Sequence, residues 1–370
     1  MKSNLFTFCI GRWAAFLSAV LILAACTASP TTPVSLPTPT SPPPTMKPIP
    51  SPLSTARPSA REDHRMVYDS KSNRVILFGG RNNSQDNFIP FLETWAFEVN
   101  SATWTEMKPE VSPGAIFEPM VYDSQAGCTI YYAGMKGSYP AYTANAETWA
   151  YDDDTNTWTN LQSVNTPAGL GDGGMAYDAK SDKVILFGGV SGENIHQAIN
   201  QTWAFDYKTN SWMQMQPAVS PPAMGWPAMA YDSESDRVLA WGGWPSMDAR
   251  PSLERTPMWV YDFNSNTWEA LTNTDGPVEG YLGAMAYDPD LDRSFLYVGN
   301  QFWSYDYNNN RWEKLKDVSA KPGRRADHAL VYASQSKYVI LFGGNDNLNQ
   351  PDNETWFYDP QSDEWAKAGP

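Results

Sequence analysis

Apolar and polar residues alternate in short segments that recur from residue 58 to the end of the chain. One segment reads Met66-Val67-Tyr68-Asp69, and its first position holds a large apolar residue in every repeat. Side chains of a strand point alternately to opposite faces, so this pattern predicts a strand with large residues on one face and small ones on the other. We expect the large column and the tyrosine column to be core. The large column consists of Met66, Met120, Met175, Met229, Met285 and Leu330.

Three further strands follow in each repeat. In the first repeat the four strands are predicted at residues 64–68, 74–78, 94–97 and from residue 104. Turns rich in Asp and Asn separate the first strand from the second and the third from the fourth, because these side chains bond nearby amides and tolerate left-handed backbone. The second strand ends in Gly79-Gly80, where glycine permits positive φ or close backbone approach.

Pairs of tryptophans nine residues apart mark six units. A period near fifty residues with paired aromatics and glycine pairs predicts propeller blades. The pairs are Trp95/Trp104, Trp149/Trp158, Trp203/Trp212, Trp259/Trp268, Trp303/Trp312 and Trp356/Trp365. The predicted blades cover residues 58–109, 110–162, 163–216, 217–271, 272–315 and 316–370.

These markers together resemble the kelch family of the galactose-oxidase-like propeller superfamily. The resemblance covers residues 58–370 and implies an all-β fold, a six-bladed β-propeller of four-stranded kelch-type blades. It also implies that a ligand is held on the face that carries the long, variable loops. Each unit runs from the innermost strand to the outermost, so six whole blades do not require a strand swapped between the two ends of the chain.

The first 57 residues predict an export signal, an anchor and a stalk. Residues 1–25 read as a signal peptide, and Leu23-Ala24-Ala25-Cys26 resembles the lipobox of bacterial lipoproteins, which implies lipidation of Cys26. An ordinary secretory signal with an incidental cysteine is the alternative. Residues 26–57 are rich in Pro, Thr and Ser and predict a disordered stalk. We therefore expect a protein outside the cytoplasm, lipid-anchored to the bacterial cell membrane or outer membrane.

Charge and cysteine content narrow the partners. The net charge of −15 argues against binding to nucleic acid or to anionic lipid surfaces. Cys9 leaves with the signal peptide and Cys26 takes the lipid, so Cys128 alone remains and no disulfide is predicted. Cys128 lies in an apolar strand pattern and is expected to be buried.

The candidate site is the mouth of the propeller, where the chain enters each innermost strand. Closure places Arg61 and His64 of the first blade beside Arg325 and His328 of the last, which suggests an anion-binding patch flanked by aromatic side chains. The alternative is that these arginines and histidines satisfy loop backbone and inter-blade ion pairs. The candidate ligand-binding residues are Arg61, Asp63, His64, Phe117, Glu118, Asp172, Trp226, Tyr281, Arg325, Asp327 and His328.

Blade five carries an unusually short loop. Only Asn300, Gln301 and Phe302 separate its glycine from its first tryptophan, where most blades have about a dozen residues. The missing residues predict a notch in the rim, which is either an opening for ligand or simply a lost loop.

Function is predicted as binding, with a glycan or an extracellular or envelope protein as the partner. The copper ligands of galactose oxidase are not matched, and no catalytic residue, metal site or cofactor is predicted. One alternative is a carbohydrate-active enzyme that uses Asp63 and Asp327 at the mouth. The other is an architectural envelope lipoprotein.

Overall fold

The computed structural model describes residues 45–369 except 83–88, 116–117, 137–142, 192–193, 246–255, 273–274, 279–281, 319, 347 and 349. The predicted signal peptide, Cys26 and the first part of the predicted stalk lie outside the described residues. In the described part of the chain, no helix is long and apolar enough to cross a membrane.

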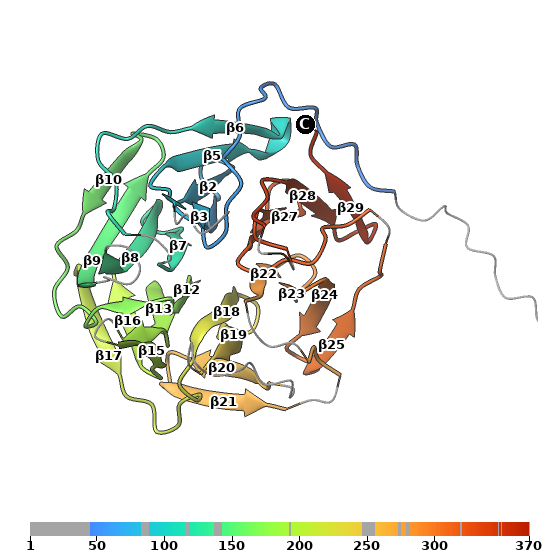
Figure 1. Ribbon diagram of the computed structural model, residues 1–370. Coiled ribbons are helices and arrows are strands. Elements are labelled where there is room, and N and C mark those ends of the chain that lie inside the picture. The colour runs from blue at the N-terminus through green and yellow to red at the C-terminus, as the bar shows by residue number, and fades with distance from the viewer. Residues whose placement is uncertain are drawn as a thin grey trace, which may run out of the picture. The chain divides into compact units, whose positions relative to one another are not determined.

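Six four-stranded antiparallel sheets make up residues 65–367 of the described chain (Figure 1). Each is called a blade here and is numbered in chain order. Blade one contains β1 (Arg65–Asp69), β2 (Arg74–Phe78), β5 (Thr94–Glu98) and β6 (Thr103–Glu106), and blade two contains β7 (Met120–Asp123), β8 (Cys128–Lys136), β9 (Thr143–Asp152) and β10 (Thr157–Asn160). Blade three contains β12 (Gly174–Asp178), β13 (Lys183–Phe187), β16 (Thr202–Asp206) and β17 (Ser211–Met215), and blade four contains β18 (Gly225–Asp232), β19 (Arg237–Trp244), β20 (Met258–Asp262) and β21 (Thr267–Leu271). Blade five contains β22 (Ala284–Asp288), β23 (Arg293–Val298), β24 (Gln301–Asp306) and β25 (Arg311–Lys314), and blade six contains β26 (Ala329–Ala333), β27 (Tyr338–Phe342), β28 (Thr355–Asp359) and β29 (Glu364–Lys367).

Short additional strands lie in the connections. β3 (Arg81–Asn82) pairs with β4 (Ile89–Pro90), and β14 (Val190–Ser191) pairs with both β11 (Leu170–Gly171) and β15 (Asn194–Ala198). β11 lies in the connection between blades two and three, and the other four lie in the long connections beyond the glycine pairs. Part of the loop face is therefore itself hydrogen-bonded structure.

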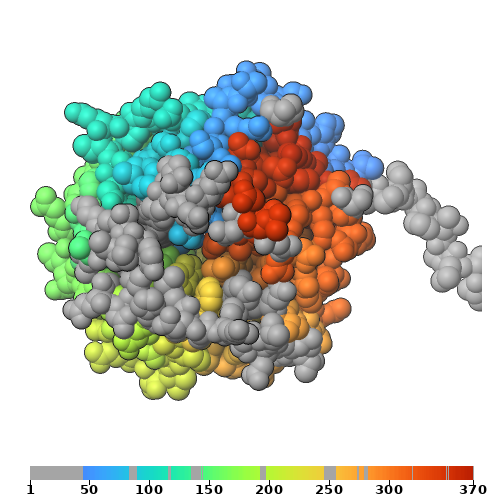
Figure 2. All heavy atoms as spheres, in the orientation of Figure 1, coloured from blue at the N-terminus to red at the C-terminus, as the bar shows by residue number. Residues whose placement is uncertain are grey.

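The blades close into a ring. The innermost strands contact one another in the order β1, β7, β12, β18, β22 and β26, and β26 returns to β1. The colours accordingly run around the ring until the first and last blades are neighbours (Figures 1 and 2). Every blade is one uninterrupted stretch of chain, as the repeat phase predicted. The predicted all-β kelch-type propeller is confirmed.

The register within a blade explains the repeated pattern. In blade one Met66 lies opposite Leu77, Leu77 opposite Trp95, and Trp95 opposite Glu106. The side chains of the second strand are the most deeply buried, with no exposed surface at Val75, Ile76 and Leu77. Alternate residues of these strands pack against the blades on either side, so the core consists of the layers between blades.

Tyrosine and Asp or Asn side chains fix the tight turns. The Tyr68 hydroxyl donates to Asn73 Oδ1 at 2.8 Å, and Asn73 has a left-handed φ of 59°. Asp69 Oδ1 accepts the amides of Lys71 and Ser72. The same tyrosine bond, to Asp or Asn five residues later, recurs at Tyr177, Tyr231 and Tyr287. The polar turn residues are therefore required by backbone geometry.

The second tryptophan of a pair joins neighbouring blades. Its indole nitrogen donates to the threonine that directly precedes the first tryptophan of the preceding blade, as Trp158 does to Thr94 at 2.9 Å. Equivalent bonds join Trp104 to Thr355, Trp212 to Thr148 and Trp268 to Thr202. Blades four and five have Met258 and Phe302 at the threonine position, and Phe302 packs against Trp365 with ring centroids 4.9 Å apart.

The chain from residue 46 to residue 53 lies against the first and last blades. Met46 and Ile49 pack on the apolar layer between them. The Leu53 amide donates to Thr103 Oγ1 of β6 at 3.0 Å, and the Tyr338 hydroxyl of β27 donates to the Lys47 carbonyl at 3.3 Å. The predicted disordered stalk of residues 26–57 thus includes a segment that contacts the propeller, through the side chains of Met46 and Ile49 and the backbone amide of Leu53.

Cys128 is 7% exposed at the start of β8. Burial raises the pKa of its thiol to about 12. The structure thus places it in the core, as predicted, and keeps the thiol protonated and unreactive.

Candidate functional site

A cavity of about 140 Å³ opens on the propeller axis, at the end where the chain enters the innermost strands. All six blades contribute to it. Its wall includes the predicted core column, Met66, Met120, Met175, Met229, Met285 and Leu330. Most of these side chains are buried, with Met66 only 7% exposed, yet they also form the floor of the cavity. These residues belong to the core, as expected, and they also line the cavity, which was not expected.

A ring of left-handed residues surrounds this mouth. Five blades place a residue with φ between 54° and 57° at the same position, and these residues are Asp63, Asp172, Trp226, Leu282 and Asp327. The Asp63 amide donates to the Asp327 carbonyl at 2.9 Å, and the Trp226 amide donates to the Asp172 carbonyl at 2.7 Å. Blade six is thus joined to blade one, and blade three to blade four, backbone to backbone at the mouth, and these bonds stiffen its rim.

The glycine pairs make room for this rim. Gly80 has a φ of 93°, and a Cβ there would lie 2.8 Å from the Glu62 carbonyl oxygen and 2.9 Å from the His64 Cβ. Any other residue would push the entering segment away from the blade.

Arg61 is fully buried beneath the rim. Its Nη1 donates to the Gly79 carbonyl at 2.8 Å and pairs with Glu93 at 3.3 Å, and its guanidinium lies 4.3 Å from the centre of the Phe91 ring. Burial lowers the pKa of Arg61 to about 10, and it stays charged at neutral pH. Its role is to hold the glycine corner of its own blade.

Arg325 repeats this arrangement in blade six. Its Nη1 donates to the Gly343 carbonyl at 2.9 Å and also pairs with Asp352, while its Nη2 pairs with Glu354 at 2.6 Å. The side chain is 5% exposed. Neither arginine presents its guanidinium to solvent, so the predicted anion-binding role is replaced by the structural alternative.

His64 and His328 occupy equivalent places between blades. His64 packs edge-on against Phe342, and His328 against Tyr297, each with ring centroids 5.3 Å apart. Burial lowers the pKa of His64 well below its usual value and that of His328 to about 3. Both rings are neutral at physiological pH, and both also contribute to the cavity wall.

The seam between blades six and one carries a polar network. Arg81 Nε lies 2.7 Å from Asp63 Oδ2 and 3.1 Å from Glu62 Oε1. Asn345 Nδ2 donates to Glu62 and, at 3.3 Å, to Asp327 Oδ2. The structure therefore does bring the first and last blades together here, through carboxylates, Arg81 and Asn345 rather than through the predicted arginine and histidine pairs.

Arg65 is a mouth residue that the sequence interpretation missed. Its Nη2 lies 3.8 Å from Asp172 Oδ1, although the two residues belong to blades one and three. The side chain must therefore reach past blade two, at the axial end of the ring. The sequence did distinguish Arg65, because the other blades have proline or a small residue at the equivalent position. These residues are Pro119, Gly174, Ala228, Ala284 and Ala329.

The remaining candidates differ in exposure. Glu118 is fully buried, and Trp226 is half-buried on the cavity wall with its ring centroid 6.1 Å from that of Trp244. Phe117 and Tyr281 lie outside the described residues. Trp226 is thus the predicted aromatic contact residue that the structure places at the mouth.

Burial and like charge shift two carboxyl groups at the mouth. The pKa of Asp172 is raised to about 7, first by burial and then by Asp63. The pKa of Asp327 is raised well above its usual value, first by burial and then by Asp63 and Glu62. Both shifts occur although Arg81 acts on each group in the opposite direction.

The short loop of blade five is a two-residue turn, Gly299-Asn300, between β23 and β24. The Gly299 carbonyl accepts the Arg325 amide at 2.7 Å, and the Asn300 carbonyl accepts Lys321 Nζ at 2.8 Å. The chain that leads into blade six therefore lies against this turn, and the predicted opening for ligand is not supported at this place.

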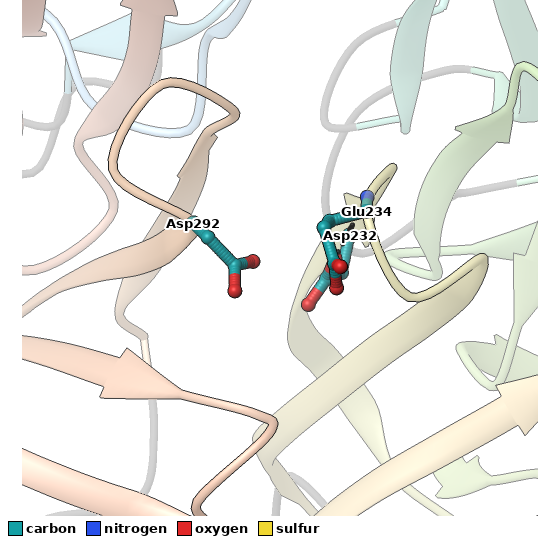
Figure 3. A group of neighbouring side chains, drawn as sticks. All are labelled: Asp232, Glu234 and Asp292. Atoms are coloured by element: carbon teal, nitrogen blue, oxygen red, sulfur yellow. Dashed lines mark hydrogen bonds between the residues drawn. The ribbon is translucent and has the colours of Figure 1, made fainter.

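An acidic group lies on the opposite face, at the turns of blades four and five. Carboxylate oxygens of Asp232, Glu234 and Asp292 lie within 4.8 Å of one another and point toward the space between the two blades (Figure 3). Asn308 Nδ2 donates to Asp292 Oδ2 at 2.8 Å and to Glu234 Oε2 at 3.2 Å. These two hydrogen bonds from Asn308 offset part of the repulsion between the carboxylates.

Two family models match overlapping parts of the chain. The KLHDC2/KLHL20/DRC7 kelch-repeats domain matches residues 45–216, and the attractin/LZTR1 β-propeller matches residues 137–302. The protein contains a kelch-repeat β-propeller. The first match begins at residue 45, so it includes the segment at residues 46–53, which packs on the first and last blades.

A curated relative of the kelch propeller is Mei4-dependent protein 6 of Schizosaccharomyces pombe. It is 27% identical over 166 residues, which are 42% of this chain and 23% of the relative. The chain therefore corresponds to less than a quarter of that protein's length. Kelch propellers commonly mediate protein binding, and the prediction of a binding module with a protein partner agrees with this at that level.

Proposed function

We propose that this kelch propeller is a binding module that holds a protein partner over its mouth. The observation that carries the proposal is the axial cavity, which has a rigid, backbone-bonded rim and the half-buried Trp226 on its wall. A rigid rim loses little conformational entropy on binding, and a partly exposed tryptophan is a typical anchor of protein interfaces.

Site-specific photo-crosslinking tests this proposal. A photoreactive phenylalanine replaces Trp226 or Trp244 at the mouth in the full chain, and Met213 on the outermost strand of blade three in the control. Met213 is 54% exposed and lies at the outer edge of the ring, away from the mouth. We expect one discrete protein adduct from the mouth positions and none from Met213. Adducts of equal yield from all three positions would contradict a mouth-directed partner.

We further propose that the module acts outside the cytoplasm on a lipid anchor at Cys26. The support is the signal-like run of residues 1–25 that ends in Leu-Ala-Ala before the cysteine. In bacterial cells fed a labelled fatty acid, the wild-type chain should carry label and sediment with membranes. Cys26→Ala should lose both, whereas Cys128→Ala should lose neither.

A glycan partner is the second candidate. Trp226 and Trp244 lie next to each other at the mouth with their rings inclined by 57°, and aromatic faces of this kind stack on sugars. A glycan array probed with the full chain separates the two candidates. Retention of one sugar class that is lost in Trp226→Ala favours the glycan, and absence of any retained sugar favours the protein partner.

A further inference from the structure

The mouth carries more negative than positive charge. Five carboxyl groups gather there against two guanidinium groups. The carboxyl groups belong to Glu62, Asp63, Glu118, Asp172 and Asp327, and the guanidinium groups belong to Arg65 and Arg81. We call these seven residues the mouth cluster. Arg61 and Arg325 do not belong to it, because their charges are paired behind the rim with Glu93, Asp352 and Glu354.

Two carboxyl groups of the mouth cluster have raised pKa values, for which burial is the first cause and neighbouring carboxylates the second. The pKa of Asp172 and that of Asp327 are both raised, although Arg81 lowers each and Arg65 also lowers that of Asp172. Burial and the neighbouring carboxylates therefore outweigh the two cations. A positively charged ligand group would relieve this excess, and a negatively charged one would add to it.

Several buried side chains at the mouth carry polar atoms that make no hydrogen bond, among them Asp172, His64 and His328. Asp172 is 7% exposed and its Oδ1 makes no hydrogen bond, with Arg65 Nη2 3.8 Å away. His328 is 6% exposed, forms part of the cavity wall, and makes no hydrogen bond through either ring nitrogen. Buried polar atoms of a folded protein are normally satisfied. An unsatisfied carboxylate oxygen and a neutral imidazole are both acceptors for a charged N–H donor.

The carboxylates are too widely spread for a metal ion. Among the described residues, one group of three His, Cys, Asp or Glu side chains brings its ligand atoms within 4.8 Å of one another. That group is Asp232, Glu234 and Asp292, on the opposite face. A metal ion needs its ligand atoms within about 2.0–2.6 Å of one point. An organic cation places its several N–H donors over a wider area, which suits carboxylates that project from different blades.

The cavity beneath the mouth cluster has the size and lining for one long side chain. Its volume is about 140 Å³, and an apolar cavity of roughly 150 Å³ is known to accept a group the size of benzene. Apolar atoms, among them those of Met229, Met285 and Ala284, make up about half of the cavity lining, and polar atoms make up the other half. Lysine and arginine bury their methylene stems on such surfaces and keep the charged head among polar groups.

We propose that the mouth accepts a single arginine or lysine side chain of the protein partner. The stem lies along the methionine and alanine wall beside Trp226, and the cationic head bonds to Asp172 and the neighbouring carboxylates. This inference rests on the proposed function and specifies its chemistry: the partner presents a basic residue, not an acidic one.

Titration of the full-length protein with short peptides tests the inference. The probes are acetylated and amidated pentapeptides with glycine flanks and a central Arg, Lys, citrulline, norleucine or Glu, and binding is measured by isothermal titration calorimetry. Citrulline keeps the shape of arginine and removes its charge. We expect Arg or Lys to bind at least about tenfold more tightly than the other three.

The variants locate the interaction. Asp172→Asn keeps the size of the side chain and removes its charge, and it should weaken Arg and Lys binding at least about fivefold. Glu234→Gln removes an equal charge on the opposite face and should leave binding unchanged. Thermal melts of each variant verify folding, and Trp226→Ala provides a second change at the mouth that leaves the carboxylates in place.

Three results would overturn the inference: tighter binding of the Glu peptide, equal binding of citrulline and arginine, or no binding of any peptide up to about 10 mM. The photo-crosslinking experiment distinguishes this failure from that of the proposed function. A protein adduct at Trp226 without preference for basic peptides leaves the binding function in place and removes the basic-residue inference alone. Absence of both results removes the proposed function as well.

Discussion

The indole nitrogen of Trp104 donates a hydrogen bond to Thr355 Oγ1 at 2.9 Å, although the two residues lie 251 positions apart in the sequence. Trp104 belongs to blade one and Thr355 to blade six, and both are buried. The bond repeats the Trp158–Thr94 bond between blades two and one. The junction between the chain's ends is therefore built like an ordinary junction inside the ring.

Thr355→Val tests how much this closing bond contributes. Valine keeps the shape of threonine but leaves the buried indole N–H without an acceptor, which costs about 1–3 kcal/mol. We expect Thr355→Val to lower the free energy of unfolding in urea by that amount, and Thr94→Val to act similarly. An unchanged midpoint for Thr355→Val would show that the ring closes without help from this bond.

Much of the fold could be predicted because its determinants repeat. The tryptophan pairs, the glycine pairs and the Tyr-Asp turns each perform one local task, and the tryptophan pairs, present in all six blades, fix the phase. The fate of Arg61 could not be predicted in the same way. Its burial depends on the Gly79 corner and on Glu93, and only the folded blade brings these beneath the rim.

Arg65 is the opposite case, because the sequence contained a pattern that would have identified it as a mouth residue. The arginine interrupts a column of small residues that the strand pattern places next to the core column, as at Ala228 and Ala284. Comparison across blades, rather than along one blade, identifies it as a side chain that extends over the axis. The charge balance of the mouth depends on such contacts between blades and was not predictable from composition.

Arg61→Ala separates structural from ligand-binding roles. The arginine is buried and bonded to the Gly79 carbonyl and Glu93, so its loss leaves a buried acceptor and a carboxylate without their partner. We expect destabilisation of about 3 kcal/mol or more and a clear drop in the melting temperature. Trp226→Ala, at a half-buried position, should change the melting temperature far less. Equal melting temperatures for the two variants would contradict the structural role of Arg61 and would make it a candidate ligand contact again.

Asp172 should make stability depend on pH. Burial and Asp63 raise its pKa to about 7, against Arg65, Arg81 and a bond from Trp226, whereas an unfolded aspartate titrates near about 3.9. The folded state therefore favours the protonated form. The stability that it contributes is fully present below about pH 4 and is lost as the pH rises through about 7.

Asp172→Asn should remove this part of the pH dependence. The variant should be more stable than the wild type at pH 8, by an amount on the order of a few kcal/mol, and should approach it near pH 4. Urea unfolding at a series of pH values measures the difference. His328→Gln serves as a comparison. Burial lowers the pKa of His328 to about 3, so the contribution of His328 to stability rises with pH between about 3 and 6.5 and should be lost in this variant. A constant gap between Asp172→Asn and the wild type from pH 4 to pH 8 would refute the shift.

Glu234→Lys should stabilise the junction of blades four and five. At the equivalent place between blades three and four, Lys180 Nζ lies 2.9 Å from Asp236 Oδ2. Glu234 instead faces Asp292, so the substitution exchanges a like-charge contact for an ion pair (Figure 3). Exposed pairs contribute about 0.2–1 kcal/mol, and we expect a rise in melting temperature that shrinks in high salt. Lys180→Glu should produce the reverse change.

The uninterrupted blades have a consequence for how such a molecule can be rearranged. Within the described part of the chain, no strand is shared between the first and last blades, so the ring has no fixed starting point apart from the segment at residues 46–53. New termini placed between β21 and β22, with the old ends joined by a linker, would leave all six sheets intact. Duplication or deletion of one stretch of chain would likewise add or remove a whole blade, which gives this architecture a direct genetic route to rings of other sizes.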